Sequence, residues 1–200
     1  MLDLKTPDSS LARQVEELLH AAAPPFLTNH SFRSHAWSVA LAHRDGIRFD
    51  AELLYVAALL HDIGLLAAYD TGSRCFEEDG ADVAAGLADA EGWSTERREA
   101  LAEAIRLHTA LEISFGDGAE AYLLWHATGV DVTGHRYGEI DPETLAAVVS
   151  DYPRLDFAHG FMELVASQAA RKSGCWANRA SKGGLAARIA AAPFESETRR

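Results

Sequence analysis

One short segment constrains the fold more than any other part of the sequence. Residues Ala57 to Gly64 end an almost wholly apolar helix, and this end carries a histidine and an aspartate side by side, His61 and Asp62. Burying an ionised carboxylate costs on the order of several kcal/mol unless a partner compensates its charge. A metal ion meets this need, because neutral imidazole and carboxylate oxygen both bind zinc, iron and manganese. The alternative is a capping aspartate beside a buried, hydrogen-bonded histidine.

The remainder of the chain has the apolar periodicity of helices, and no alternating strand pattern is found. Apolar residues recur every three or four positions, as at Leu11, Val15 and Leu18. Helices are expected to start near Ser9 or Ser10, Thr28 or Asn29, Asp50, Asp79, Ser94, Ala119, Asp141, Phe157 and Leu185. The sequence therefore predicts an all-α fold, an irregular helical bundle. We expect one domain over residues 1–200, with a core at about 26–172 and a partly flexible tail at 173–200.

Composition and charge narrow the class of partner. Thirty acidic residues against 18 basic ones give a net charge of −12, which opposes binding to nucleic acid or anionic membranes. No apolar run is long enough to span a bilayer, and the first residues lack a secretion signal. Cys75 and Cys175 have no metal or redox spacing, so we expect free thiols in a reducing cytoplasm. A cytoplasmic protein acting on a small molecule is expected, and a homo-oligomer stays open.

Helical faces separate two histidines of the same segment. His30 lies on one face with Trp37, at an offset of seven residues, and we expect it to point inward. His35 lies on a face with Ser31 and Ser38, which is polar. The pattern therefore favours His30 as a ligand and predicts a solvent-exposed His35.

Further along the chain, His108 shares an apolar face with Leu101, which directs it into the core. His126 is also expected on an inward face. Asp131 lies between two valines near a helix end, so it is either a buried functional acid or a cap. The other histidines are read as surface or packing residues: His20, His43, His135 and His159.

The order of these residues matches a known family. His30, then His61 and Asp62 about thirty residues later, then Asp131 resemble the H…HD…D pattern of the HD-domain metal-dependent hydrolases. Several segments resemble more closely the cyanamide hydratase branch of that superfamily. These segments are Asn29–Arg33, Leu54–Gly64, Phe76–Ala81, Ala104–Thr109, Gly129–Gly134 and Tyr152–Arg154. The resemblance covers about residues 26 to 172 and implies a helical bundle of the HD-domain type.

The resemblance also implies a site. Its metal ligands would be His30, His61, Asp62 and Asp131, holding one divalent ion, with zinc favoured and iron or manganese as alternatives. Such an ion lowers the pKa of water towards neutrality. In a cyanamide hydratase-like reaction this water attacks a nitrile carbon and gives urea or an amide. His108 is expected to be catalytic as proton donor or orienting group, because imidazole exchanges protons near neutral pH. Asp62 is expected to help orient the water.

The expected walls of the substrate pocket are Arg33, Trp37, Phe76 and Glu77. Among them, Arg33 is expected to pair with a buried acid rather than to touch substrate. The sequence departs from the family at two positions. Glu78 stands where an apolar residue is usual, and Cys75 separates Arg74 from Phe76. Substrate preference can therefore differ from that of other members.

Three alternatives stay open at this point. An HD phosphohydrolase acting on a nucleotide or other phosphomonoester would gather arginines around the phosphate, and Arg33, Arg74 and Arg106 are candidates. A di-iron oxygenase would need additional ligands, which His108 and His126 can supply. The third alternative is a non-enzymatic ligand sensor or scaffold.

Overall fold

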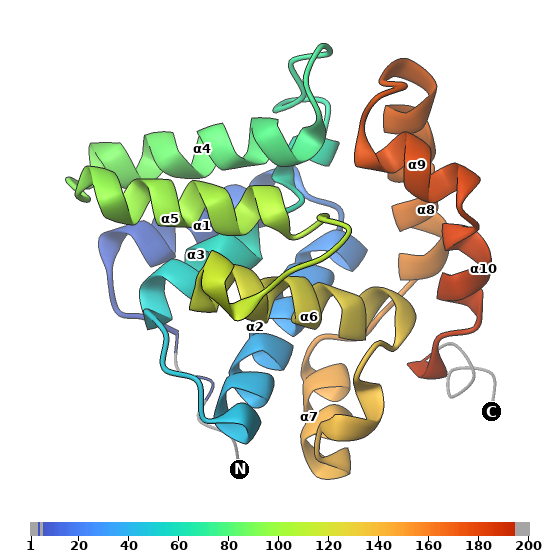
Figure 1. Ribbon diagram of the computed structural model, residues 1–200, viewed down its shortest axis with the longest axis horizontal. Helices are drawn as coiled ribbons and strands as arrows, with labels where there is room; N and C mark the ends of the chain where they lie inside the picture. Colours follow the sequence, from blue (N-terminus) through green and yellow to red (C-terminus); the bar gives the residue numbers. More distant parts are fainter. Residues whose placement is uncertain (1–3, 5, 195–200) are drawn as a thin grey trace.

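The computed structural model describes residue 4 and residues 6–194, and these residues form helices, turns and connecting loops with no strand (Figure 1). The all-α prediction is confirmed for them. Three short 3-10 helices, η1 to η3, lie at Ile63–Leu65, Phe115–Asp117 and Tyr137–Glu139. The α-helices are α1 (Ser10–Ala22), α2 (Pro25–Asp45), α3 (Ala51–Leu60), α4 (Phe76–Ala90), α5 (Thr95–Leu107), α6 (Ala119–Thr133), α7 (Pro142–Asp151), α8 (Phe157–Arg171), α9 (Trp176–Lys182) and α10 (Leu185–Ala190).

Helix α3 occupies the centre of the bundle. Every residue from Leu53 to Leu60 is buried, as expected for a helix that is apolar on all sides. Helices α1, α2, α4, α5 and α6 all contact it, while α4 and α5 form an antiparallel pair at one end of the molecule (Figure 1). Because α3 ends at the core centre, His61 and Asp62 are delivered to a buried position.

Most predicted helix starts are found, and two are wrong by about one turn. Side-chain caps at Ser9, Asp50, Ser94 and Asp141 open their helices as expected. Helix α2 starts at Pro25, before Thr28, because proline loses no hydrogen bond at the first helical position. Helix α4 starts at Phe76 and not at Asp79, with three acidic residues in its first turn that complement the helix dipole.

The C-terminal region contains more helix than the sequence predicted. One short helix was expected at about Leu185 to Ala191, and α10 lies there, but α9 before it was not foreseen. We call α9 and α10 together the C-terminal cap. Its apolar residues Ala177, Leu185 and Ile189 are buried in the main hydrophobic core. Helices α8 to α10 form one side of the molecule, opposite α4 and α5 (Figure 1). Residues 195–200 of the expected flexible tail lie outside the described residues.

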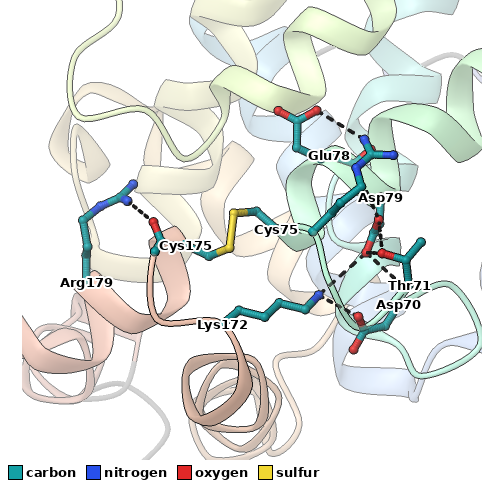
Figure 2. The surroundings of a disulfide bond; sticks show 10 residues. Asp70, Thr71, Cys75, Glu78, Asp79, Lys172, Cys175 and Arg179 are labelled. Carbon is teal, nitrogen blue, oxygen red and sulfur yellow. Dashed lines mark hydrogen bonds and ion pairs between the residues drawn. A yellow bond between two sulfur atoms is a disulfide. The ribbon is translucent and has the colours of Figure 1, made fainter.

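The expectation of free thiols is wrong. Cys75 and Cys175, 100 residues apart in the sequence, form a disulfide with a Cα–Cα distance of 5.3 Å (Figure 2). Sequence spacing could not reveal this pair, because packing brings the residue before α4 beside the residue before α9. Because the two cysteines are paired, they give no support to the expectation that the protein resides in a reducing compartment. Within residues 6–194, no helix has the length and apolar character needed to cross a bilayer.

The prediction of an exposed His35 is also wrong. Its side chain is buried and lies edge-on to Tyr55, with ring centroids 4.8 Å apart. Burial lowers the pKa of His35 to about 4, so the imidazole is neutral at physiological pH. The neighbouring serines misled the pattern, because a serine in a helix can be buried when its hydroxyl donates back to its own backbone. Ser38 does so, with its Oγ 2.9 Å from the carbonyl oxygen of Ser34.

Candidate metal centre

Three potential ligands converge at the centre of the bundle. His30 comes from the second turn of α2, and His61 and Asp62 follow the last turn of α3. All three side chains are buried. Nε2 of His30 lies 3.1 Å from Nε2 of His61, and Oδ2 of Asp62 lies 3.4 and 3.2 Å from these two nitrogens. These residues form the group of histidine and carboxylate side chains that can hold a metal ion in the described part of the chain.

Each histidine is held by a hydrogen bond from its other ring nitrogen. Nδ1 of His61 donates to the carbonyl oxygen of Ala58 at 2.8 Å, and Nδ1 of His30 donates to Oδ2 of Asp131 at 2.7 Å. A carbonyl or an ionised carboxylate only accepts, so the ring proton must reside on Nδ1. In the neutral form of each ring, Nε2 therefore carries a lone pair directed towards Asp62, which is the orientation that metal-binding histidines need.

The donor set fits a divalent ion. Two unprotonated Nε2 atoms at 3.1 Å repel each other unless a cation or proton lies between them. Oδ2 of Asp62 is buried and accepts no hydrogen bond, an arrangement that is costly for a carboxylate without a counter-charge. Ligand atoms of one tetrahedral zinc lie about 3.3–3.6 Å apart, close to the separations of the three atoms here. Three protein ligands leave room for a further ligand, as in catalytic zinc sites.

The electrostatics of the cluster also favour a positive charge. Burial alone would lower the pKa of His30, but the hydrogen bonds and charges of Asp131 and Asp62 outweigh it and raise the pKa. Burial would raise the pKa of Asp62, yet attraction to His61 and the facing imidazoles of His108 and His30 hold it well below its usual range. The same field that stabilises an imidazolium would stabilise a metal cation.

Asp131 lies behind His30 rather than among the three ligands. Its carboxylate accepts hydrogen bonds from Nδ1 of His30 and from Arg33, whose Nε and a terminal nitrogen lie 2.7 and 2.8 Å away. Trp37 Nε1 donates to the same carboxylate at 2.9 Å, and Arg154 bonds the Asp131 carbonyl at 3.0 Å. This placement differs from the predicted ligand role, because these contacts occupy both carboxylate oxygens. Arg33 pairs with a buried acid as expected.

Trp37 and Arg33 therefore contact Asp131, and their side chains do not point into the cavity where a substrate would bind. Neither residue lines the cavity beside the metal centre, in contrast to the expected pocket walls. The periodicity that placed Trp37 on the face of His30 is correct, but that face of the helix points at Asp131. Burial would raise the pKa of Asp131, and Arg33 and Arg154 outweigh it and hold the pKa well below its usual range.

His108 faces the other carboxylate oxygen of Asp62, the one that His30 and His61 do not face. It follows the last residue of α5, and its Nε2 lies 3.5 Å from Oδ1 of Asp62. Its Nδ1 donates to the carbonyl oxygen of Ile105, which leaves the lone pair of Nε2 directed at Asp62. The His108 ring lies edge-on to Phe76, with centroids 5.6 Å apart. An inward-facing His108 was the expectation from its apolar face.

A cavity of about 280 Å³ opens from this centre. His30, His61, Asp62 and His108 lie at its inner end, and Phe76 forms part of its wall. Glu77 was expected beside Phe76, but it does not line the cavity. Its carboxyl is buried, and burial raises the pKa of this group.

Sequence reasoning missed the outer half of the cavity. Trp125 of α6 and three residues of the C-terminal cap, Trp176, Leu185 and Arg188, form much of this outer wall. The only sequence signal was an aromatic residue directly after each cysteine, at Phe76 and Trp176. Their rings lie edge-on with centroids 6.0 Å apart, so the disulfide joins two segments whose aromatic residues meet in the cavity wall.

His126 does not join the metal cluster. Its Nδ1 lies 3.2 Å from Nε2 of His135, and the two rings stack with centroids 5.3 Å apart. Burial, together with the charges of Arg136 and His135, lowers the pKa of His126 to about 4. The suggestion that His126 could supply an additional ligand therefore finds no support in this geometry. His135, read from sequence as a surface residue, is exposed and also borders the cavity.

Comparison with known proteins agrees with this centre. The sequence matches the HD domain family over residues 27–156, which contain all three candidate ligands, Asp131 and His108. The chain therefore belongs to the HD-domain family of metal-dependent hydrolases. It is similar to two yeast proteins, the cyanamide hydratases DDI2 and DDI3 of Saccharomyces cerevisiae. Each is 31% identical to it over 185 residues, which cover 88% of this chain and 80% of the relative.

Proposed function

We propose that this protein is a metal-dependent hydratase of a nitrile, resembling cyanamide hydratase. In the reaction, water adds across the carbon–nitrogen triple bond, so that cyanamide gives urea and another nitrile gives an amide. The observation that carries the proposal is the unpartnered Oδ2 of Asp62 facing the lone pairs of His30 and His61. The likeness to two cyanamide hydratases along most of the chain supports the choice of reaction.

The proposed ligands are His30, His61 and Asp62, with Asp131 as the group that orients His30. We propose one zinc ion per chain, since two imidazoles and a carboxylate suit it, although iron and manganese use the same donors. When bound, the ion supplies a Lewis acid that makes water acidic enough to act as a nucleophile near neutral pH. The cytoplasmic location stays a prediction.

His108 is the proposed proton carrier. Because its proton is held on Nδ1, Nε2 can accept a proton from the attacking water beside Asp62. The same nitrogen then returns that proton to the nitrile nitrogen, where negative charge develops. The products balance without another reactant, because both hydrogens of the water end up on the imidic acid, which tautomerises to the amide or urea.

A phosphohydrolase is less well supported, because the arginines available for phosphate are already engaged. Arg33 is bound to Asp131, Arg74 to Asp82, and Arg106 to Glu78. Arg188 is the one arginine or lysine among the described residues that line the cavity. A phosphoryl group normally requires more than one such contact.

A di-iron oxygenase is also less well supported. It needs a second set of ligands, yet His126 pairs with His135 instead of facing the cluster. Within residues 6–194, only His30, His61 and Asp62 form a group of three or more potential ligands. His108 alone could extend this group.

The deciding experiment measures metal content per chain and urea release from cyanamide on the same sample. We expect about one zinc per chain with urea formation, and loss of both in His61→Ala, which removes a ligand. The control is His159→Ala, because His159 is an exposed histidine on α8 outside the centre. Two irons per chain without urea formation would contradict the proposal. A metal-loaded protein that converts no small substrate would favour a sensor or scaffold.

A further inference from the structure

The cavity is larger than a cyanamide molecule requires. Its volume of about 280 Å³ equals that of about nine water molecules at roughly 30 Å³ each. Pockets for metabolite-sized ligands begin near this size, at about 300 Å³. A ligand of three heavy atoms would leave most of the space to solvent, so the cavity is suited to a larger molecule.

The walls of the cavity indicate the shape of that molecule. Phe76 and Phe161 from the core line the cavity together with Trp125 of α6 and Trp176 of the C-terminal cap. Aromatic walls on several sides favour a flat, apolar body, because such a body replaces water on both of its faces. The C-terminal cap adds Leu185 to this apolar surface.

The outer end of the cavity carries a positive charge. Arg188 of α10 is exposed and borders the cavity, and its guanidinium has no ion pair or hydrogen bond to any other described side chain or backbone group. A guanidinium presents paired N–H donors that match a carboxylate in geometry. One arginine suffices for a carboxylate, whereas a phosphate normally gathers several basic groups.

We propose that Arg188 binds the carboxylate of the natural substrate, a nitrile with a flat apolar body, and so determines specificity. This inference rests on the proposed function, which places the nitrile at His30, His61 and Asp62. Whole-protein charge does not prevent it, because the long-range repulsion of a net charge of −12 is screened beyond about 8–10 Å at physiological salt.

The test compares two ligands of almost equal shape, 4-cyanobenzoate and its neutral amide analogue 4-cyanobenzamide. Binding to the zinc-loaded full chain is measured by titration calorimetry, which does not depend on turnover. We expect 4-cyanobenzoate to bind more tightly, and Arg188→Gln to weaken it by about tenfold while changing the amide by less than twofold. Lys182→Gln is the matched control, because it removes one positive charge from the cap outside the cavity.

Equal affinity for the two ligands would overturn the inference. A preference for the carboxylate that persists in Arg188→Gln would also overturn the inference, because the carboxylate would then bind at the metal or elsewhere. Urea formation from cyanamide is measured on the same samples. If urea forms from cyanamide but Arg188→Gln does not weaken the binding of 4-cyanobenzoate, the proposed function stands and this inference is refuted. Arg188-dependent binding without hydration of any nitrile would retain the carboxylate site and refute the proposed reaction.

Discussion

At the scale of single residues, Asp131 links the metal centre to the stability of the fold. Its carboxylate orients His30 and neutralises Arg33, and both of these side chains are buried. Asp131→Asn keeps the shape but removes the charge. We expect the free energy of unfolding in urea to fall by about 3–5 kcal/mol, because a buried guanidinium loses its counter-ion.

The same substitution should weaken metal binding by roughly 10- to 100-fold, because groups that orient metal-binding histidines have effects of this size. Metal affinity is measured by competition with a chelator. Asp151→Asn, which alters an exposed residue of α7, serves as the control and should change stability by less than about 0.5 kcal/mol. If Asp131 is itself a ligand, metal content should collapse as completely as in His61→Ala, and the orienting role would be wrong.

At the scale of elements, the contact between η1 and α4 depends on the absence of a side chain at Gly64. A Cβ built there would lie 2.1 Å from the carbonyl oxygen of Phe76, which is backbone and cannot rotate away. Gly64→Ala should therefore destabilise the protein by about 1–3 kcal/mol in urea unfolding and displace Phe76 from the cavity wall. Gly86→Ala is the matched control, because no atom lies within 4 Å of the added carbon. The control should be neutral or slightly stabilising.

The disulfide is a second prediction at this scale, since it joins the start of α4 to the start of α9. A cross-link that closes a loop of 100 residues restricts the unfolded chain and contributes about 2–5 kcal/mol. A dithiol reductant should lower the melting temperature and speed amide exchange in the C-terminal cap, with α3 affected least. The double variant Cys75→Ser, Cys175→Ser controls for the reagent and should not respond. An identical response of both proteins would argue against the bond.

At the scale of the whole molecule, the stability of the fold at low pH should depend on an ion cluster. This cluster joins the loop before α4 to the C-terminal end of α8. Asp70 forms an ion pair with Lys172 at 2.6 Å beside the disulfide (Figure 2). Arg171 forms a second ion pair with Asp70, also at 2.6 Å. Burial would raise the pKa of Asp70, but Lys172, the Gly72 amide and Arg171 outweigh it and hold the pKa far below its ordinary value. A depressed folded pKa contributes stability above the ordinary value near 4, and this contribution is lost as the pH falls further.

The melting temperature should therefore fall as the pH decreases from 5 to 2. Asp70→Asn should be less stable than the wild type at pH 7 and should lose less on acidification, which thermal unfolding across the pH range measures. Asp151→Asn again provides the control and should follow the wild-type curve. If the melting temperature of Asp70→Asn changes with pH in the same way as that of the wild type, Asp70 is excluded as a source of acid sensitivity.

Local signals were sufficient for much of the fold. Side-chain caps at Asp50 and Ser94 start helices in the chain itself, because they bind backbone N–H groups a few residues away. Apolar periodicity likewise predicted the inward orientation of His30 and His108. It failed at His35, where a polar helical face is covered by another helix. Periodicity reports which residues share a face, but it does not report what packs against that face.

The sequence by itself determined the all-α class, the family, and the residues that meet at the centre, because these follow from short-range patterns and from the order of His30, His61 and Asp62. Only the tertiary structure placed Asp131 behind His30, joined Cys75 to Cys175, and brought Arg188 to the cavity. Each of these facts is a contact between side chains about 100 residues or more apart, or between a distant helix and the centre. Such contacts arise from the packing of whole helices, which no local pattern of residues encodes.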